Sequence, residues 1–246
     1  MTLRAGIFDF GGVMAVSPIS RMHWLAEQFG TTPDVVLGTI FGGLGDGVDN
    51  PWHDAERGLI DIGPEFGERM AARFAVHGVG FDLAVFHEWV AGAVNYPESA
   101  MVDVVRALRA AGIPTVMLTN SVREFRPVIE RTIPVSELFD VVVDSCKVGM
   151  RKPEPGIYHL AAEMVGAPIG ECVFLDDHLG NVEAAVVEGM TAIHVTDAAA
   201  AATEVRRRFG LPVPAGHSGR LLDAVLPADV HYQNVAREAD PDLRSD

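Results

Sequence analysis

The chain has 246 residues, of which 48% are hydrophobic and 22% are charged, as in ordinary globular proteins, and it is long enough for one large domain or a core with an insertion. Its formal net charge of −15 opposes binding to nucleic acid or to an anionic membrane surface, because both require clustered basic side chains. A small anionic substrate is compatible with this charge, since a metal ion and one lysine can make a pocket locally positive.

Membrane and export signals are not evident in the sequence. No apolar run reaches the roughly 18 residues that a membrane helix requires, and Asp9 interrupts the stretch where a signal peptide would be apolar. We therefore expect a cytoplasmic protein. The two cysteines, Cys146 and Cys172, lie in stretches that resemble strands, so we expect free thiols in the core rather than a disulfide framework.

Five short runs are apolar throughout, which is typical of strands covered on both faces. They comprise residues 6–10, 114–119, 139–143, 172–176 and 191–195. Helical patterns alternate with the last four runs, over residues 98–111, 121–131, 154–165 and 179–188. This order predicts a parallel sheet with crossover helices, a three-layer α/β fold.

A long segment separates the first predicted strand from the second. It contains helical patterns but no convincing strand, and the patterns cover residues 19–29, 34–40, 64–74 and 83–93, with a glycine-rich loop at 41–47. We interpret residues 16–94 as an inserted helical cap on a core made of residues 1–15 and 95–226. The polar tail, residues 227–246, lacks a buried pattern, and we expect it to be flexible.

Polar side chains follow four of the predicted strands. Because ligands of an open parallel sheet collect at the carboxyl ends of its strands, these side chains are candidates for one shared site: Asp9 after the first strand, Thr119 and Asn120 after the second, Lys152 after the third, and Asp176 with Asp177 after the fourth. Two adjacent acids at a strand end repel each other unless a cation lies beside them. The sequence therefore favours a metal site at this edge.

The same positions carry a family resemblance. FDFGGV, LTNS, RKPEP and FLDDHLGN resemble, in the right order, the four motifs of the haloacid dehalogenase superfamily of aspartate-nucleophile hydrolases. The insertion lies where that superfamily places its helical cap, and the resemblance implies a Rossmann-like core. SCKVGMRKPEPGIY and FLDDHLGN are most similar to the amino-terminal phosphatase domain of soluble epoxide hydrolases and to related sugar-phosphate phosphatases.

The resemblance implies a magnesium-dependent phosphatase that acts on a small phosphorylated metabolite through an aspartyl-phosphate on Asp9. A carboxylate that attacks a phosphoryl group needs a divalent cation, held by hard oxygen ligands, to offset the repulsion. We expect Asp9 and Asp177 to supply side-chain ligands, and the superfamily pattern adds the main-chain carbonyl of Gly11. Asp176 is expected beside the metal or to reach it through water, oriented by Asn181.

The remaining motif residues are expected to contact the phosphate. Lys152 would offset negative charge on the nucleophile and on the phosphoryl oxygens. Thr119 and Asn120 lie where a strand passes into a helix, so their side chains and main-chain N–H groups can face phosphate oxygens. Gly12, with Gly11, allows the main chain to approach the phosphoryl group closely.

One position departs from the family pattern. Most phosphatases of the superfamily carry a second aspartate where this chain has Gly11, and that aspartate protonates the leaving oxygen. General acid catalysis is typically worth about 10²- to 10⁴-fold, so we expect a slower enzyme, a preference for good leaving groups, or an acid from elsewhere. His53, Glu56 and His23 are candidates for that acid, although each is more typical of an ordinary surface or packing residue.

Two other functions fit parts of the pattern. A haloacid dehalogenase would use the same Asp9 without a metal, but the paired acids Asp176 and Asp177 argue against it, because the dehalogenases that the chain resembles lack such a pair. A degenerate binding or regulatory protein is the second alternative, because Gly11 removes the usual acid. The sequence identifies neither the substrate nor the oligomeric state.

Overall fold

The computed structural model describes residues 2–42, 50–92 and 96–214. Most of the expected glycine-rich loop and the whole of the expected flexible tail, residues 227–246, lie outside these ranges. The predicted α/β architecture is confirmed: five parallel strands form one sheet in the order β3-β2-β1-β4-β5. Their bounds are β1 Ala5–Phe8, β2 Thr115–Thr119, β3 Val141–Asp144, β4 Cys172–Asp176 and β5 Thr191–His194.

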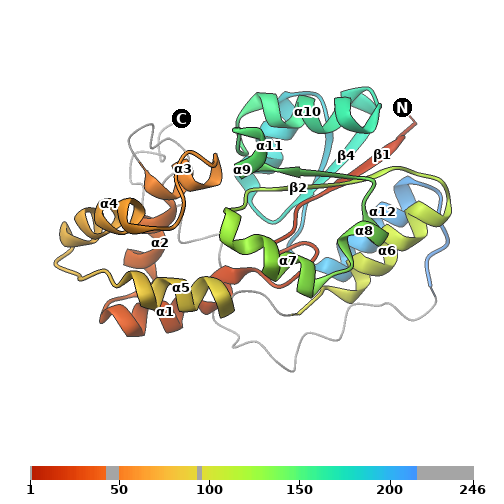
Figure 1. The fold of residues 1–246 in the computed structure, drawn as a ribbon. Helices are drawn as coiled ribbons and strands as arrows, with labels where there is room; N and C mark the ends of the chain where they lie inside the picture. Colours follow the sequence, from red (N-terminus) through yellow and green to blue (C-terminus); the bar gives the residue numbers. More distant parts are fainter. Residues whose placement is uncertain (1, 43–49, 93–95, 215–246) are drawn as a thin grey trace, which may run out of the picture.

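Successive strand residues face opposite layers of the molecule, which explains why the strands are apolar throughout. Phe8, Met117 and Leu175 belong to a hydrophobic cluster under α6 (Ser99–Ala110) and α12 (Ala198–Arg208). Their neighbours Ile7, Val116 and Phe174 belong to a second cluster under α10 (Pro155–Val165) and α11 (Leu179–Val187). Figure 1 shows these two pairs of helices on opposite faces of the sheet.

The helices between β1 and β2 form a group with its own hydrophobic cluster, built around the aromatic side chains Trp52, Phe66, Phe86 and Trp89. We call this group the helical segment. Figure 1 shows it beyond the end of the sheet at which β1 finishes. Its members are η1 (Pro18–Arg21), α1 (Met22–Phe29), α2 (Pro33–Phe41), α3 (Pro51–Glu56), α4 (Pro64–Ala75) and α5 (Leu83–Gly92).

Several predicted elements differ in detail from the observed ones. The helix expected from residue 121 begins only with the turn η2 (Arg123–Phe125) and α7 (Arg126–Thr132), because Val122 is extended and the N–H of Ser121 donates to Ser145 Oγ at 2.9 Å. The short helices α3, α8 (Val135–Leu138) and α9 (Ser145–Val148) were not predicted, since none has room for a helical repeat.

The cysteine prediction is half right. Both thiols are free and buried, but Cys146 lies in α9 rather than in a strand, whereas Cys172 begins β4. Burial raises the pKa of the Cys146 thiol to about 12, and the neighbouring Asp144 carboxylate raises it further. Cys146 is therefore an unreactive core thiol.

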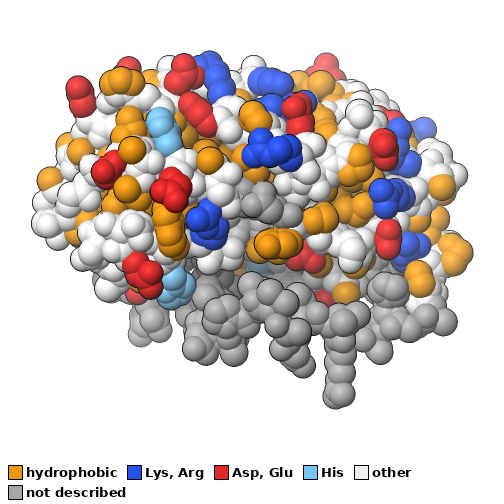
Figure 2. All heavy atoms as spheres, turned by 60° about the horizontal axis from the view of Figure 1, so that its bottom comes forward, with side chains coloured by type: hydrophobic (Ala, Val, Ile, Leu, Met, Phe, Trp, Pro, Cys, Tyr) orange, Lys and Arg blue, Asp and Glu red, His pale blue; other side chains and the backbone are white. Residues whose placement is uncertain are grey.

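Among the described residues, no helix is both long enough and apolar enough to cross a membrane. The face of the molecule in Figure 2 carries acidic and basic side chains interspersed with hydrophobic ones, and the basic side chains do not join into one continuous patch there.

Candidate active site

Asp9 follows β1 directly and is the first of the predicted site residues. Its N–H donates to the carbonyl of Leu175 in β4 at 2.9 Å, so the sheet fixes where the carboxylate begins. The chain then turns sharply, and the carbonyl of Phe10 accepts hydrogen bonds from Met14 and Ala15 at 2.9 and 3.0 Å. Asp9 is only 8% exposed.

Gly12 provides space in this turn. Its φ of +77° is in the left-handed region, and a Cβ atom placed on it would lie 2.0 Å from Asp177 Oδ2. The missing side chain of Gly12 thus leaves room for the Asp177 carboxylate. The N–H of Gly12 donates to the carbonyl of Ala15 at 2.7 Å, so this amide is already bonded within the loop. A Cβ on Gly11 would meet only Pro18 Cδ, at 3.3 Å.

Lys152 connects two of the carboxylates. Its ammonium Nζ lies 2.8 Å from Asp9 Oδ1 and 2.6 Å from Asp176 Oδ2, and the lysine is 1% exposed. Burial alone lowers the pKa of Lys152, but Asp176 and Asp9 outweigh burial and raise that pKa above its ordinary value. The lysine is therefore a permanent cation.

Asn120 holds the main chain of Lys152. Its Oδ1 accepts from the Lys152 N–H at 2.7 Å, and its Nδ2 donates to the Lys152 carbonyl at 2.9 Å. One of the two side-chain N–H bonds of Asn120 is thus committed to the protein, which sequence reasoning did not anticipate. Thr119 ends β2 and is 3% exposed. Within the described part of the chain, its hydroxyl has no hydrogen-bond partner.

Asp176 is fully buried at the end of β4 and is held from two sides. Asn181 Nδ2 lies 3.1 and 3.2 Å from its two carboxylate oxygens, and the N–H of His178 donates to Oδ1 at 2.8 Å. The orienting contact expected of Asn181 is therefore present.

Three carboxylates converge at this point. One oxygen from each of Asp9, Asp176 and Asp177 lies within 4.8 Å of the others. Burial raises the pKa of Asp9, although Lys152 opposes this shift. Burial also raises the pKa of Asp177 well above its ordinary value, and repulsion from Asp176 and Asp9 raises it further. The Lys152 ammonium contacts only Asp9 and Asp176 of these three acids, and hard oxygen ligands with excess negative charge are the donor set that a divalent cation such as Mg²⁺ requires. The residues present thus fit a magnesium ion.

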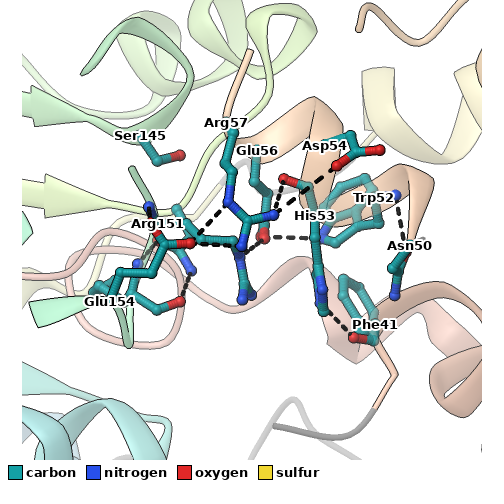
Figure 3. A network of polar contacts seen from close by, with 12 residues as sticks. Phe41, Asn50, Trp52, His53, Asp54, Glu56, Arg57, Ser145, Arg151 and Glu154 are labelled. Carbon is teal, nitrogen blue, oxygen red and sulfur yellow. Dashed lines mark hydrogen bonds and ion pairs between the residues drawn. The ribbon is translucent and has the colours of Figure 1, made fainter. Parts of the chain in front are cut away.

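The candidate replacement acids on the helical segment have other partners. Glu56 Oε1 accepts from Trp52 Nε1 at 2.9 Å, and Glu56 Oε2 lies 2.5 Å from Arg151 Nε. The Nε2–H of His53 donates to the carbonyl of Phe41 at 2.7 Å (Figure 3). His23 is exposed on α1. The contacts of Glu56 and His53 favour packing roles.

Sequence reasoning missed the residues that fix the surrounding loops. Ser145 Oγ accepts from the N–H of Ser121 at 2.9 Å and donates to its carbonyl at 3.1 Å. Arg151 and Glu154 bond to α3. The opposite charges in Glu56-Arg57 and in RKPEP were visible in the sequence, but only the folded chain brings them together.

Curated relatives include two kinds of protein. The sesquiterpene phosphatase AstK of Aspergillus oryzae is 28% identical over 85% of this chain and 98% of its own length. The bifunctional epoxide hydrolase 2 of Rattus norvegicus is 29% identical over 87% of this chain. The chain spans only 40% of that epoxide hydrolase.

Solved structures share the fold at low identity. A HAD family enzyme from Bacteroides thetaiotaomicron, in complex with magnesium and inorganic phosphate, aligns with a TM-score of 0.57 and 18% identity over 78% of this chain and 93% of its own. An L-2-haloacid dehalogenase from Xanthobacter autotrophicus aligns with a TM-score of 0.55 and 17% identity over 78% and 77%. The fold alone therefore does not separate the two chemistries.

The family itself is shown by a match at the level of sequence. The sequence model of the family described as haloacid dehalogenase-like hydrolase matches residues 18–189. This range is well over half of the chain and includes three of the four motifs. This chain is a hydrolase of the haloacid dehalogenase superfamily.

Proposed function

We propose that this hydrolase is a magnesium-dependent phosphomonoesterase that acts on a small phosphorylated metabolite through an aspartyl-phosphate on Asp9. One observation carries the proposal: the carboxylates of buried Asp9 and Asp176 and of half-buried Asp177 lie within 4.8 Å of one another, and Lys152 contributes a single positive charge to them. Relatives named as phosphatases support the same activity.

In the first step, an oxygen of Asp9 forms a bond to phosphorus while the bond from phosphorus to the leaving oxygen breaks. Lys152, 2.8 Å from Asp9, favours the ionised form of the carboxylate and holds it in place. Asp9, Asp177 and the carbonyl of Gly11 would hold Mg²⁺, with Asp176 beside it. When bound, the ion supplies the positive charge that screens two anions from each other. A water molecule then attacks phosphorus, which releases phosphate and restores the Asp9 carboxylate.

The phosphoryl oxygens have two proposed donors in the core. The Thr119 hydroxyl has no hydrogen-bond partner among the described residues, and Asn120 keeps one N–H beyond the bond to Lys152. In this proposal, Gly12 contributes space rather than a donor, because its N–H bonds to Ala15. In this proposal, the core therefore contacts the phosphoryl oxygens through these two side-chain donors and through the charge of Lys152.

The helical segment is proposed to act as the cap, with residues 16–94 inserted in a core of residues 1–15 and 95–226. A cap that closes over the sheet edge excludes water and selects the leaving group. Because Gly11 has no side chain, and because Glu56 and His53 are bonded elsewhere, the leaving oxygen receives no dedicated acid from these positions. We therefore expect a preference for leaving groups that need no protonation.

The test is hydrolysis of p-nitrophenyl phosphate with magnesium or with a chelator, using the wild type, Asp9→Asn and the control Asp61→Asn. We expect metal-dependent release of p-nitrophenol and a loss of at least about 10³-fold in Asp9→Asn, as for other catalytic nucleophiles. The control should retain its rate. Metal-independent halide release from a haloacid would instead identify a dehalogenase. Phosphate binding without turnover would identify a binding protein.

A further inference from the structure

Glu56, the last residue of α3, and the following Arg57 form ion pairs with the loop that carries Lys152. Glu56 Oε2 lies 2.5 Å from Arg151 Nε, and Arg57 lies 2.5 Å, through Nη2, from Glu154 Oε1. Arg151 and Glu154 flank Lys152 and Pro153 in the sequence. Figure 3 shows both pairs side by side between α3 and the loop. We call these four residues the double ion pair.

The first of the two pairs is buried and geometrically fixed. The side chains of Glu56 and Arg151 are 7% and 15% exposed. Glu56 also accepts a hydrogen bond from Trp52 Nε1 at 2.9 Å, so its carboxylate is held from its own helix as well. Exposed ion pairs are worth little because they are mobile and screened. A pair that is shielded from solvent and has an extra hydrogen bond keeps its two side chains in one fixed arrangement.

The backbones of the two regions also touch. A Cβ atom on Gly58 would lie 2.0 Å from the carbonyl oxygen of Cys146 in α9, and Gly58 has a φ of +69°. Only a glycine allows this approach. The segment directly after Arg57 therefore packs against the start of the loop that leads to Lys152.

The loop is fastened on its other side by the core. Asn120 bonds both the N–H and the carbonyl of Lys152, and the lysine ammonium bonds Asp9 and Asp176. The main chain around Lys152 is thus held by the core at one residue and by α3 at the residues on either side. Movement of α3 away from the loop would leave only the core contacts.

We propose that Glu56 and Arg57 are positioning residues for Lys152, which couple the docking of α3 to the placement of the lysine ammonium between Asp9 and Asp176. The catalytic part of this inference rests on the proposed phosphatase function, in which Lys152 acts on the reacting groups. The structural link between α3 and the loop does not depend on that function. Docking of α3 completes the site, and undocking loosens the lysine.

The kinetic test uses Glu56→Gln, which keeps an acceptor for Trp52 but removes the charge that Arg151 meets. We expect kcat for p-nitrophenyl phosphate to fall about tenfold or more, with KM within twofold, because small displacements of a catalytic group cost up to about 10²-fold. Arg57→Gln should lower kcat in the same way, and Arg57→Lys, which keeps the charge, should recover most of it.

The matched control is Asp61→Asn. It removes a different ion pair between the helical segment and the core, that of Asp61 with Arg123, and neither residue of this pair bonds to Arg151, Lys152 or Glu154. We expect kcat of this variant to stay within twofold of the wild type. If all three broken pairs lower kcat equally, the effect is general loosening of the junction and the positioning role is overturned.

Amide hydrogen exchange provides a readout that needs no turnover. Peptides covering residues 145–156 should exchange faster in Glu56→Gln and Arg57→Gln than in the wild type. In Asp61→Asn, they should exchange at the wild-type rate. Unchanged exchange in all variants would overturn the coupling. If the wild type hydrolyses no phosphate ester, the proposed function fails, and the exchange comparison still decides whether α3 holds the loop.

Discussion

Two groups of charged side chains lie on either side of Lys152, one at the end of the sheet and one at α3. At α3, Glu56 and Arg57 meet Arg151 and Glu154 one for one. At the end of the sheet, Asp9, Asp176 and Asp177 gather around a single ammonium, and burial with mutual repulsion raises the pKa of Asp9 and Asp177. Paired charges can hold a structure together by themselves, whereas buried carboxylates in excess either take up a proton or bind a cation. The balanced group at α3 is therefore a structural junction, and the unbalanced group at the end of the sheet is the proposed metal site.

The largest expected effect comes from removing Lys152, the cation that bonds Asp9 and Asp176. Lys152→Met should abolish activity, and it should lower the free energy of unfolding by about 3–5 kcal/mol, because it leaves buried carboxylates unpaired. Arg207→Met, which breaks an exposed ion pair with Glu204, should leave the free energy of unfolding almost unchanged, because exposed pairs are mobile and screened. Urea unfolding at pH 8 measures both, and added Mg²⁺ should return part of the stability of Lys152→Met. Equal costs for the two variants would remove the distinction between the two groups of charges.

A smaller effect is expected from filling the space beside Asp177. Gly12→Ala should lower kcat about a hundredfold, since its Cβ would displace the carboxylate. Gly78→Ala is the matched control, because Gly78 has a φ of +69° but no atom within 4 Å of a built Cβ. Both variants bear the left-handed strain of about 1–2 kcal/mol, measurable by thermal unfolding. Only Gly12→Ala should lose turnover, and a matching loss in Gly78→Ala would attribute the effect to strain alone.

Placing an acid at Gly11 should have the opposite effect and raise activity. Gly11→Asp should accelerate hydrolysis of alkyl phosphates about tenfold relative to p-nitrophenyl phosphate, because only poor leaving groups need a proton. The space near Gly11 is limited by Pro18 Cδ at 3.3 Å, which can move slightly. Gly11→Asn has the same size without the acid and serves as the control. Equal changes in Asp and Asn variants, or slower turnover of all substrates, would mean that the glycine is needed for its shape.

The smallest effect concerns pH at the paired region. Burial lowers the pKa of His53 below 6.5, and Arg151 lowers it further, while Glu56 opposes the shift. Below about pH 6.5, the unfolded chain binds a proton at His53 that the native state does not bind. The free energy of unfolding should therefore fall as pH decreases, by about 1 kcal/mol for each unit by which the pKa of His53 differs between the unfolded and the native state. His53→Gln should flatten this slope between pH 7 and 5, and the exposed His23→Gln should not. Identical slopes in all three proteins would exclude a contribution from His53.

The sequence predicted the strands well because the sheet lies between two layers of helices, so that most strand residues on both faces are apolar. All five strands were expected within two residues of their observed bounds. The helices α3, α8 and α9 were missed for the opposite reason. They are too short to show a period, and contacts with other parts of the chain stabilise them.

The hydrophobic pattern was enough to predict that Asp9, Lys152, Asp176 and Asp177 share one edge of a sheet, because parallel strands bring their carboxyl ends together whatever the details of packing. The side chains that pair there could be identified only from the packed chain. The link from Glu56 to Arg151, the clamp of Asn120 on Lys152 and the difference between Gly11 and Gly12 depend on how distant segments dock. Strand position follows from local hydrophobic pattern, whereas side-chain pairing depends on distances that only the packed chain sets.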